Sequence, residues 1–113
     1  MTNSKKIAVK TMLFKRGKDV ATVVACVPEE RFGNCKLVKN KDGKVRPNSF
    51  GVFIEVRGKD LFTPKYHCPL TKYESYLASQ GWEFVCSIRG TYGKTVPNAF
   101  DIAHIYIRAY KAL

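Results

Sequence analysis

The sequence predicts an α+β fold: one domain with about six or seven antiparallel strands and one main α-helix at residues 72–80. Two patterns lead to this prediction. Short apolar, β-branched stretches are separated by glycine and proline turns, and a single segment shows helical spacing of its apolar residues. With 113 residues, 45% of them hydrophobic, the chain has room for one globular core and not for two, so residues 1–113 form a single domain.

The first two predicted strands form a hairpin. Residues 5–15 are rich in strand formers, and Gly17 provides a turn. The β-branched run from Val20 to Val27 follows and ends at Pro28.

Three further strand segments are expected before the helix. Residues 35–39 and 45–46 flank Asp42-Gly43, a hairpin-tip signal. Residues 50–56 form the next strand. Residues 61–67 are interrupted by a proline, which predicts an edge strand there.

The helix at 72–80 has recognisable ends. Thr71 and Glu74 match a capping box, Tyr73 and Leu77 lie on one apolar stripe, and Gly81 stops the helix.

Two strands complete the prediction. Trp82, Phe84, Cys86 and Ile88 alternate as if they formed one buried face. After the loop 89–99, the residues from 100 to 110 are predicted to form the closing strand.

An internal similarity suggests a duplication. Residues 43–50 (GKVRPNSF) and 93–100 (GKTVPNAF) share five of eight positions, and Arg16-Gly-Lys-Asp recurs at residues 57–60. The repeat units would span about 5–56 and 57–110. After the shared phenylalanine, the alternation of apolar residues is offset by one position between the two copies. This leaves open a bulge in one copy or a strand buried on both faces.

Composition excludes several classes. No apolar run is long enough for a membrane span, and no signal peptide is evident, so a cytoplasmic protein without membrane contact is expected. The four cysteines lack C-x-x-C spacing, which favours free thiols over a metal site or disulfides. No catalytic or cofactor-binding motif and no convincing carboxylate pair occurs, so neither enzyme activity nor a cofactor is predicted.

The charge points to a polyanionic partner. Lys and Arg number 20 against nine acids, a formal charge of +11. Cations crowd the segment 36–46, and the loop 89–99 combines cations, glycines and an aromatic ring. The sequence therefore predicts a non-enzymatic nucleic-acid-binding protein, such as a phage or mobile-element accessory protein, with these contact residues: Lys36, Lys39, Lys41, Lys44, Arg46, Arg57, Lys59, Arg89, Tyr92 and Lys94.

Two other functions stay open. The same cations suit an inhibitor that docks on an acidic protein surface. Alternatively, Arg89, Gly90, Gly93 and Lys94 would cradle a phosphorylated ligand such as a nucleotide. The choice between DNA and RNA, the preferred strandedness and any base specificity are not determined. A homodimer through strand edges at 5–15 or 61–67 is also open.

The last third of the chain resembles a small bacterial and phage domain family of uncharacterised function. The resemblance rests on Leu77, Gly81-Trp82-Glu83-Phe84-Val85 and Ile105-Tyr-Ile-Arg108. It implies a helix, a Gly-Trp-Glu corner, an apolar strand and a basic closing strand. It implies no catalytic residue.

Overall fold

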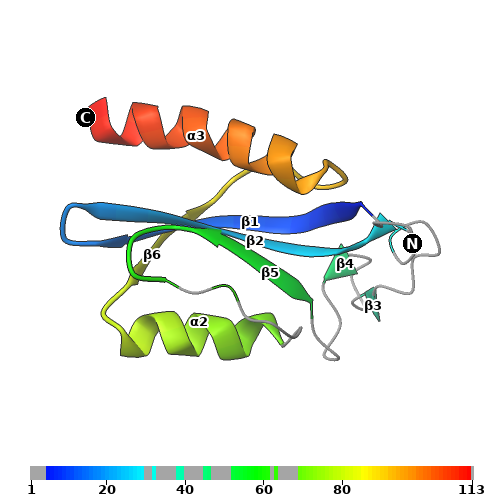
Figure 1. The fold of residues 1–113 in the computed structure, drawn as a ribbon, viewed down its shortest axis with the longest axis horizontal. Coiled ribbons are helices and arrows are strands. Elements are labelled where there is room, and N and C mark those ends of the chain that lie inside the picture. Colours follow the sequence, from blue (N-terminus) through cyan, green and yellow to red (C-terminus); the bar gives the residue numbers. More distant parts are fainter. Residues whose placement is uncertain are drawn as a thin grey trace.

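The computed structural model describes residues 5–29, 32, 38–39, 45–46, 52–61, 63 and 69–112, with the backbone alone at 38–39, 45–46 and 110–112. Its main feature is a four-stranded antiparallel sheet with one helix on each face (Figure 1). The strand order is β5-β2-β1-β6. The α+β class is therefore confirmed, and the sheet has four strands in place of the six or seven predicted.

The predicted N-terminal hairpin is confirmed. Strands β1 (Lys6–Arg16) and β2 (Asp19–Pro28) pair along nearly their whole length, from Lys6 opposite Pro28 to Arg16 opposite Asp19. Gly17 has φ 61°, a left-handed conformation that glycine adopts without steric cost. A register shift between Ala8 and Lys10 places a bulge early in β1.

The outer strands lie on either side of this hairpin. Strand β5 (Phe53–Arg57) pairs with β2, and β6 (Glu83–Ser87) pairs with β1. Residues 5–15 are therefore inside the sheet, and the suggestion that they form an edge open to a second subunit is wrong. Of the other suggested edge, 61–67, only residues 61 and 63 are described, and neither belongs to a strand.

A separate ribbon joins β3 (Val38–Lys39) to β4 (Val45–Arg46) by two residue pairs. The predicted hairpin tip at Asp42-Gly43 lies outside the described residues.

The predicted helix corresponds to α2 (Leu70–Ser79), which covers one face of the sheet (Figure 1). Tyr73 and Leu77 are buried, as the stripe predicted, and Gly81 follows the helix with φ 87°. The predicted capping box does not form, because the helix starts one residue before Thr71 and no side chain caps it. The Pro69 carbonyl accepts backbone hydrogen bonds in the first turn instead.

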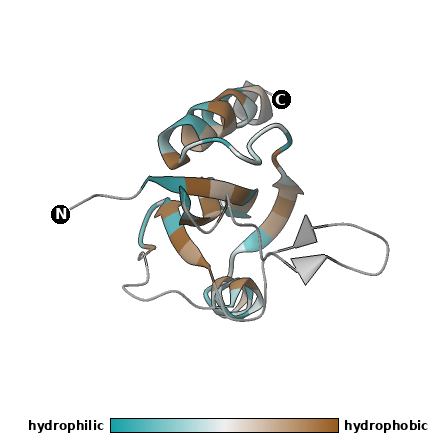
Figure 2. Cartoon of the chain, turned by 90° about the vertical axis from the view of Figure 1, so that its right-hand side faces the viewer, coloured by the Kyte–Doolittle hydropathy of each residue, from teal (hydrophilic) through white to brown (hydrophobic). Residues whose placement is uncertain are grey.

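The predicted closing strand at 100–110 is wrong, because these residues belong to helix α3 (Val96–Ala112). The buried residues Ala99, Phe100 and Ala103 and the partly buried Val96 and Ile107 follow helical spacing, and α3 lies along the second face of the sheet (Figures 1 and 2). The fully buried alanines 99 and 103 let the helix approach the strands closely.

This helix also removes support for the duplication. The similar segments 43–50 and 93–100 lead into different structures, a strand (β5) and a helix (α3).

The predicted single buried face of β6 is wrong as well. Leu13 pairs with Cys86 whereas Phe14 pairs with Phe84, so Val85 is an extra, bulged residue. Because of this bulge, the residues before and after Val85 that alternation would place on one face point to opposite faces of the sheet. Trp82 packs in the cluster under α2, Ile88 packs with Leu13 on the α3 face, and Phe84 is left 56% exposed.

Candidate functional site

The predicted cationic residues fall into three groups. Lys36, Lys41 and Lys44 lie outside the described residues. Lys39 and Arg46 are described only as backbone positions in the ribbon of β3 and β4.

The second group lies at the β5 edge of the sheet. The guanidinium of Arg57 stacks on the ring of Phe100, 4.2 Å from its centroid, and so joins β5 to α3. Lys59 is exposed in the turn that follows the strand. Arg57 therefore has a packing role in addition to its charge.

The third group, Arg89, Tyr92 and Lys94, lies in the loop between β6 and α3. This loop runs beside the start of β1, because the Gly93 amide donates to the Ala8 carbonyl at 2.9 Å and the Ala8 amide donates to the Lys94 carbonyl at 2.7 Å. Tyr92 is 48% exposed and packs against Phe32, with ring centroids 5.2 Å apart.

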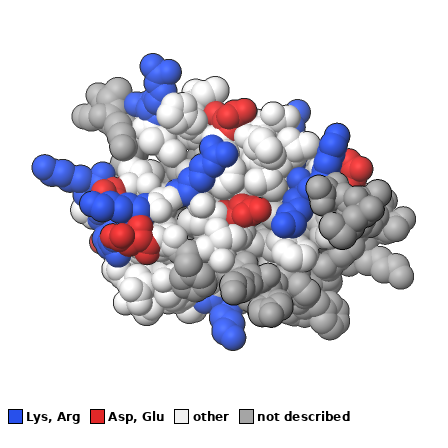
Figure 3. Space-filling model, viewed as in Figure 1, with Lys and Arg blue, Asp and Glu red and all other residues white. Residues whose placement is uncertain are grey.

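The second and third groups lie at opposite edges of the sheet, because the second follows β5 and the third follows β6, and these are its two outer strands. On the face shown in Figure 3, Lys and Arg side chains lie at both ends, in the middle and at the lower border, with acidic side chains interspersed among them. The described cations are thus spread over the surface, and the predicted residues whose side chains the structure describes do not form one continuous site.

Few of these charges are compensated. In the part of the chain that the structure describes, three ion pairs form, Lys6–Glu55 at 3.9 Å, Lys15–Glu83 at 3.9 Å and Arg16–Asp60 at 3.6 Å. The other described cationic side chains have no carboxylate partner among the described residues. They are Lys5, Lys10, Lys18, Arg57, Lys59, Lys72, Arg89, Lys94 and Arg108.

The β6 edge combines cations with exposed aromatic rings. Phe84 lies on β6, and Lys10 projects from the neighbouring β1 into the same cavity that Phe84 lines. The sequence prediction omitted both residues. Together with Arg89, Tyr92 and Lys94 they form what we call the β6-edge surface. It extends from the level of Ala8 to the level of Phe14 on β1, about 20 Å at ~3.3 Å per residue.

A signal for Lys10 was present in the sequence. It is the only charged residue between Ile7 and Phe14, in an otherwise strand-forming stretch. Because a lysine is rarely buried without a partner, its ammonium group at the centre of a strand must reach solvent. Phe84 gave no such signal, because its alternation with Trp82 predicts a buried residue, whereas it lies on an outer strand of the sheet and is 56% exposed.

The loop is poorly suited to cradle a phosphate with its backbone. The amides of Gly93 and Lys94 already donate to the carbonyls of Ala8 and Thr91, at 2.9 Å each. Gly90 has φ 88° and open space around its missing side chain.

Other chemistry finds little support among the described residues. They contain no cluster of three His, Cys, Asp or Glu side chains that could hold a metal. Cys26 and Cys86 are free thiols, and burial raises the pKa of Cys26 to about 12. His104 is exposed on α3 rather than on a strand. Within the described ranges, no helix has both the length and the apolar character needed to cross a bilayer.

Comparison with known proteins returned no match to a protein-family model, a curated protein or a solved structure.

Proposed function

We propose that the protein binds single-stranded nucleic acid, without catalysis, along the β6-edge surface. The observation that carries this proposal is the row of uncompensated cations interleaved with exposed rings: Lys10, Arg89 and Lys94 with Phe84 and Tyr92. Cations that neutralise phosphates release condensed counterions, and aromatic rings stack on unpaired bases irrespective of sequence.

A single strand fits this surface better than a duplex. Stacking on a side chain requires a base that is not already stacked in a helix. Helix α2 carries Lys72 as its one cationic residue, so it offers no cluster of cations for reading a major groove. The acidic residue of β6, Glu83, is paired with Lys15 and so opposes the phosphates only weakly.

The test compares two charge-reversed variants of equal net charge. R89E/K94E alters the β6-edge surface, and K18E/K59E alters two exposed cations outside it, one in the turn between β1 and β2 and one in the turn after β5. Binding of a labelled mixed-sequence single strand of about twelve nucleotides is measured by fluorescence anisotropy at low salt. We expect R89E/K94E to lose at least tenfold in affinity and K18E/K59E to lose about threefold or less, because reversing a contacting charge costs more than lowering the overall field.

Equal losses in the two variants would show that binding follows net charge alone, and absence of binding by the wild type would overturn the proposal. An additional variant, Tyr92→Leu, separates this function from docking on an acidic protein surface. Docking on an acidic surface depends on the cations, so Tyr92→Leu would leave it unchanged. Stacking on a base also requires the aromatic ring, so the same variant would weaken binding of the single strand.

A further inference from the structure

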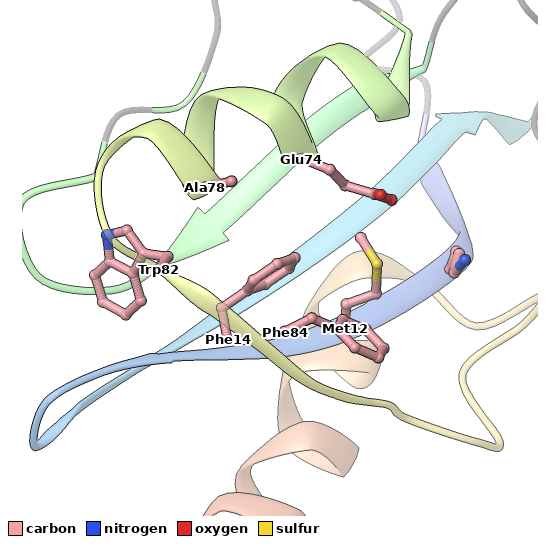
Figure 4. Close-up of a pocket in the computed structure, with 7 residues that line it drawn as sticks. Met12, Phe14, Glu74, Ala78, Trp82 and Phe84 are labelled. Carbon is pink, nitrogen blue, oxygen red and sulfur yellow. The ribbon is translucent and has the colours of Figure 1, made fainter.

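We propose that the cavity between α2 and the β6 edge is a pocket for one guanine base. The cavity has a volume of about 330 Å³ and is lined by Met12, Phe14, Trp82, Phe84 and Ala78, together with Lys10 and Glu74 (Figure 4). This volume is at the small end of the range for ligand sites, which suits a single flat ring rather than a larger molecule.

The walls of the cavity are apolar and held in place. Met12, Phe14 and Trp82 are at most 4% exposed, so they belong to the core and their positions are fixed by packing. Phe84 meets Phe14 edge to face, at 5.7 Å between centroids and an interplanar angle of 75°. Its own ring is 56% exposed and therefore available for stacking.

The small side chain of Ala78 keeps the opposite wall open. Ala78 is exposed on α2 and lines the cavity, one turn after Glu74. A larger residue at this helix position would fill the space that a ring needs.

The polar groups of the cavity select among bases. Glu74 comes from α2 and Lys10 from β1, and neither forms an ion pair with a described residue. In Figure 4 the Glu74 carboxylate reaches over the cavity toward Met12. The cavity therefore offers a carboxylate that accepts hydrogen bonds and an ammonium that donates them.

Guanine matches this pair of groups best. Its N1–H and N2 amino group are adjacent donors that a carboxylate accepts together, and its O6 accepts from an ammonium. Cytosine and adenine present one exocyclic amino group beside a ring nitrogen that accepts, so each offers the carboxylate a single donor. Thymine and uracil offer one N–H between two carbonyl oxygens.

The pocket shares Lys10 and Phe84 with the β6-edge surface, so a strand bound there passes the cavity mouth. That the base arrives as part of a strand rests on the proposed function. A free guanine nucleotide offers the same chemistry, and the experiment separates the two sources.

Trp82 provides the readout, because it is the single tryptophan of the chain and lines the cavity. Its fluorescence is followed on addition of GMP, AMP, CMP or UMP, and of oligo-dT strands with a central dG, dA, dC or dT. We expect the dG strand to bind about tenfold more tightly than the others, the discrimination typical of a bidentate base contact.

Three variants test the pocket itself. Ala78→Leu fills it and is expected to abolish the preference for dG while oligo-dT binding persists. Glu74→Gln loses the two-oxygen acceptor and is expected to reduce the preference. Ser79→Leu, a similar enlargement at an exposed α2 position that does not line the cavity, is expected to change neither the preference for dG nor the binding of oligo-dT.

Each other outcome is decisive. Equal binding of all strands, unaffected by Ala78→Leu, overturns the pocket and leaves the proposed function standing. A GMP response that Ala78→Leu removes, without binding of any strand, supports the pocket and overturns the proposed function. A preference for another base that Ala78→Leu removes overturns the assignment to guanine.

Discussion

Arg16 illustrates why a count of cations overstates the charge available to a ligand. Its guanidinium stacks on Trp82 at 4.6 Å, donates to the Gln80 carbonyl at 3.3 Å and approaches Asp60 at 3.6 Å. One side chain thus ties the end of β1 to the end of α2 and to the turn after β5. In the sequence, Arg16 and Arg57 are indistinguishable from solvent-exposed turn cations, yet each stacks on an aromatic ring.

The thiol of Cys26 gives a prediction about pH. It is fully buried and donates to the Phe53 carbonyl at 3.4 Å. Burial and the charge of Glu55 raise its pKa from the ordinary 9.0 to about 12, and Lys6 lowers it less than they raise it. Between pH 9 and 12 the unfolded thiol has lost its proton while the folded thiol keeps it, so stability falls as pH rises, at ~1.4 kcal/mol per pH unit.

The comparison is with Cys26→Ala, which lacks the titrating group. Denaturant unfolding at about pH 8 and about pH 10.5 is expected to show a loss of free energy in the wild type that exceeds the loss in the variant by ~1–2 kcal/mol. The variant's own deficit from its smaller side chain is the same at both pH values. Identical pH dependence of the two proteins would contradict the assigned pKa.

At the scale of elements, α3 makes the sharpest prediction. In a strand, residues 103 and 105 would share a face, whereas in a helix they point in nearly opposite directions. Ala103 is fully buried against the sheet, and Ile105 is 67% exposed. Ala103→Lys is therefore expected to destabilise the protein by at least ~3 kcal/mol, and Ile105→Lys to change its stability by less than ~0.5 kcal/mol, in thermal or urea unfolding. Similar large losses in both variants would indicate a strand.

The same helix shows what the sequence could and could not predict. Strand β1, strand β2, their turn at Gly17 and helix α2 follow from local patterns that agree with their burial. Residues 102–107 (IAHIYI) are rich in β-branched and aromatic residues, and local propensity favours a strand. The helical spacing of Ala99, Phe100, Ala103 and Ile107 is the better signal. This spacing outweighs the strand propensity only in the folded protein, where the apolar residues on the second face of the sheet must be buried by a helix.

Strand β6 shows a second limit. Regular alternation from Trp82 to Ile88 would place every second residue on one face of the sheet. The one bulged residue, Val85, moves the residues that follow it to the opposite face. The exposure of Phe84, on which the candidate site depends, follows from the position of β6 at the edge of the sheet, which no feature of the sequence nearby reveals.

At the scale of the whole molecule, the formal charge of +11 suggests a polyanionic ligand but does not indicate which surface would bind it. Tertiary structure separates Arg57 and Lys59 from Arg89 and Lys94 by the width of the sheet, which their spacing in the sequence does not reveal. Conversely, β1 brings Lys10 beside a loop some 80 residues later in the chain.

Salt dependence measures how many cations the strand contacts. Each phosphate neutralised on a single strand contributes about −0.7 to the slope of log affinity against log salt concentration. The three cations of the β6-edge surface alone would give about −2. Participation of Lys36, Lys39, Lys41, Lys44 and Arg46 as well would raise the number of contacting cations to eight and give about −5.6.

We expect the steeper slope and so extend the proposed contact beyond the β6-edge surface, because the segment 36–46 contains five cations and one aspartate. Replacing Lys39, Lys41 and Lys44 by Gln removes three charges without reversing them, so the slope is expected to become shallower by about 2 while the thermal midpoint stays within about 2 °C. A wild-type slope near −2 that the triple variant leaves unchanged would confine binding to the β6-edge surface. A large fall in the thermal midpoint would instead assign these lysines to the stability of the folded protein.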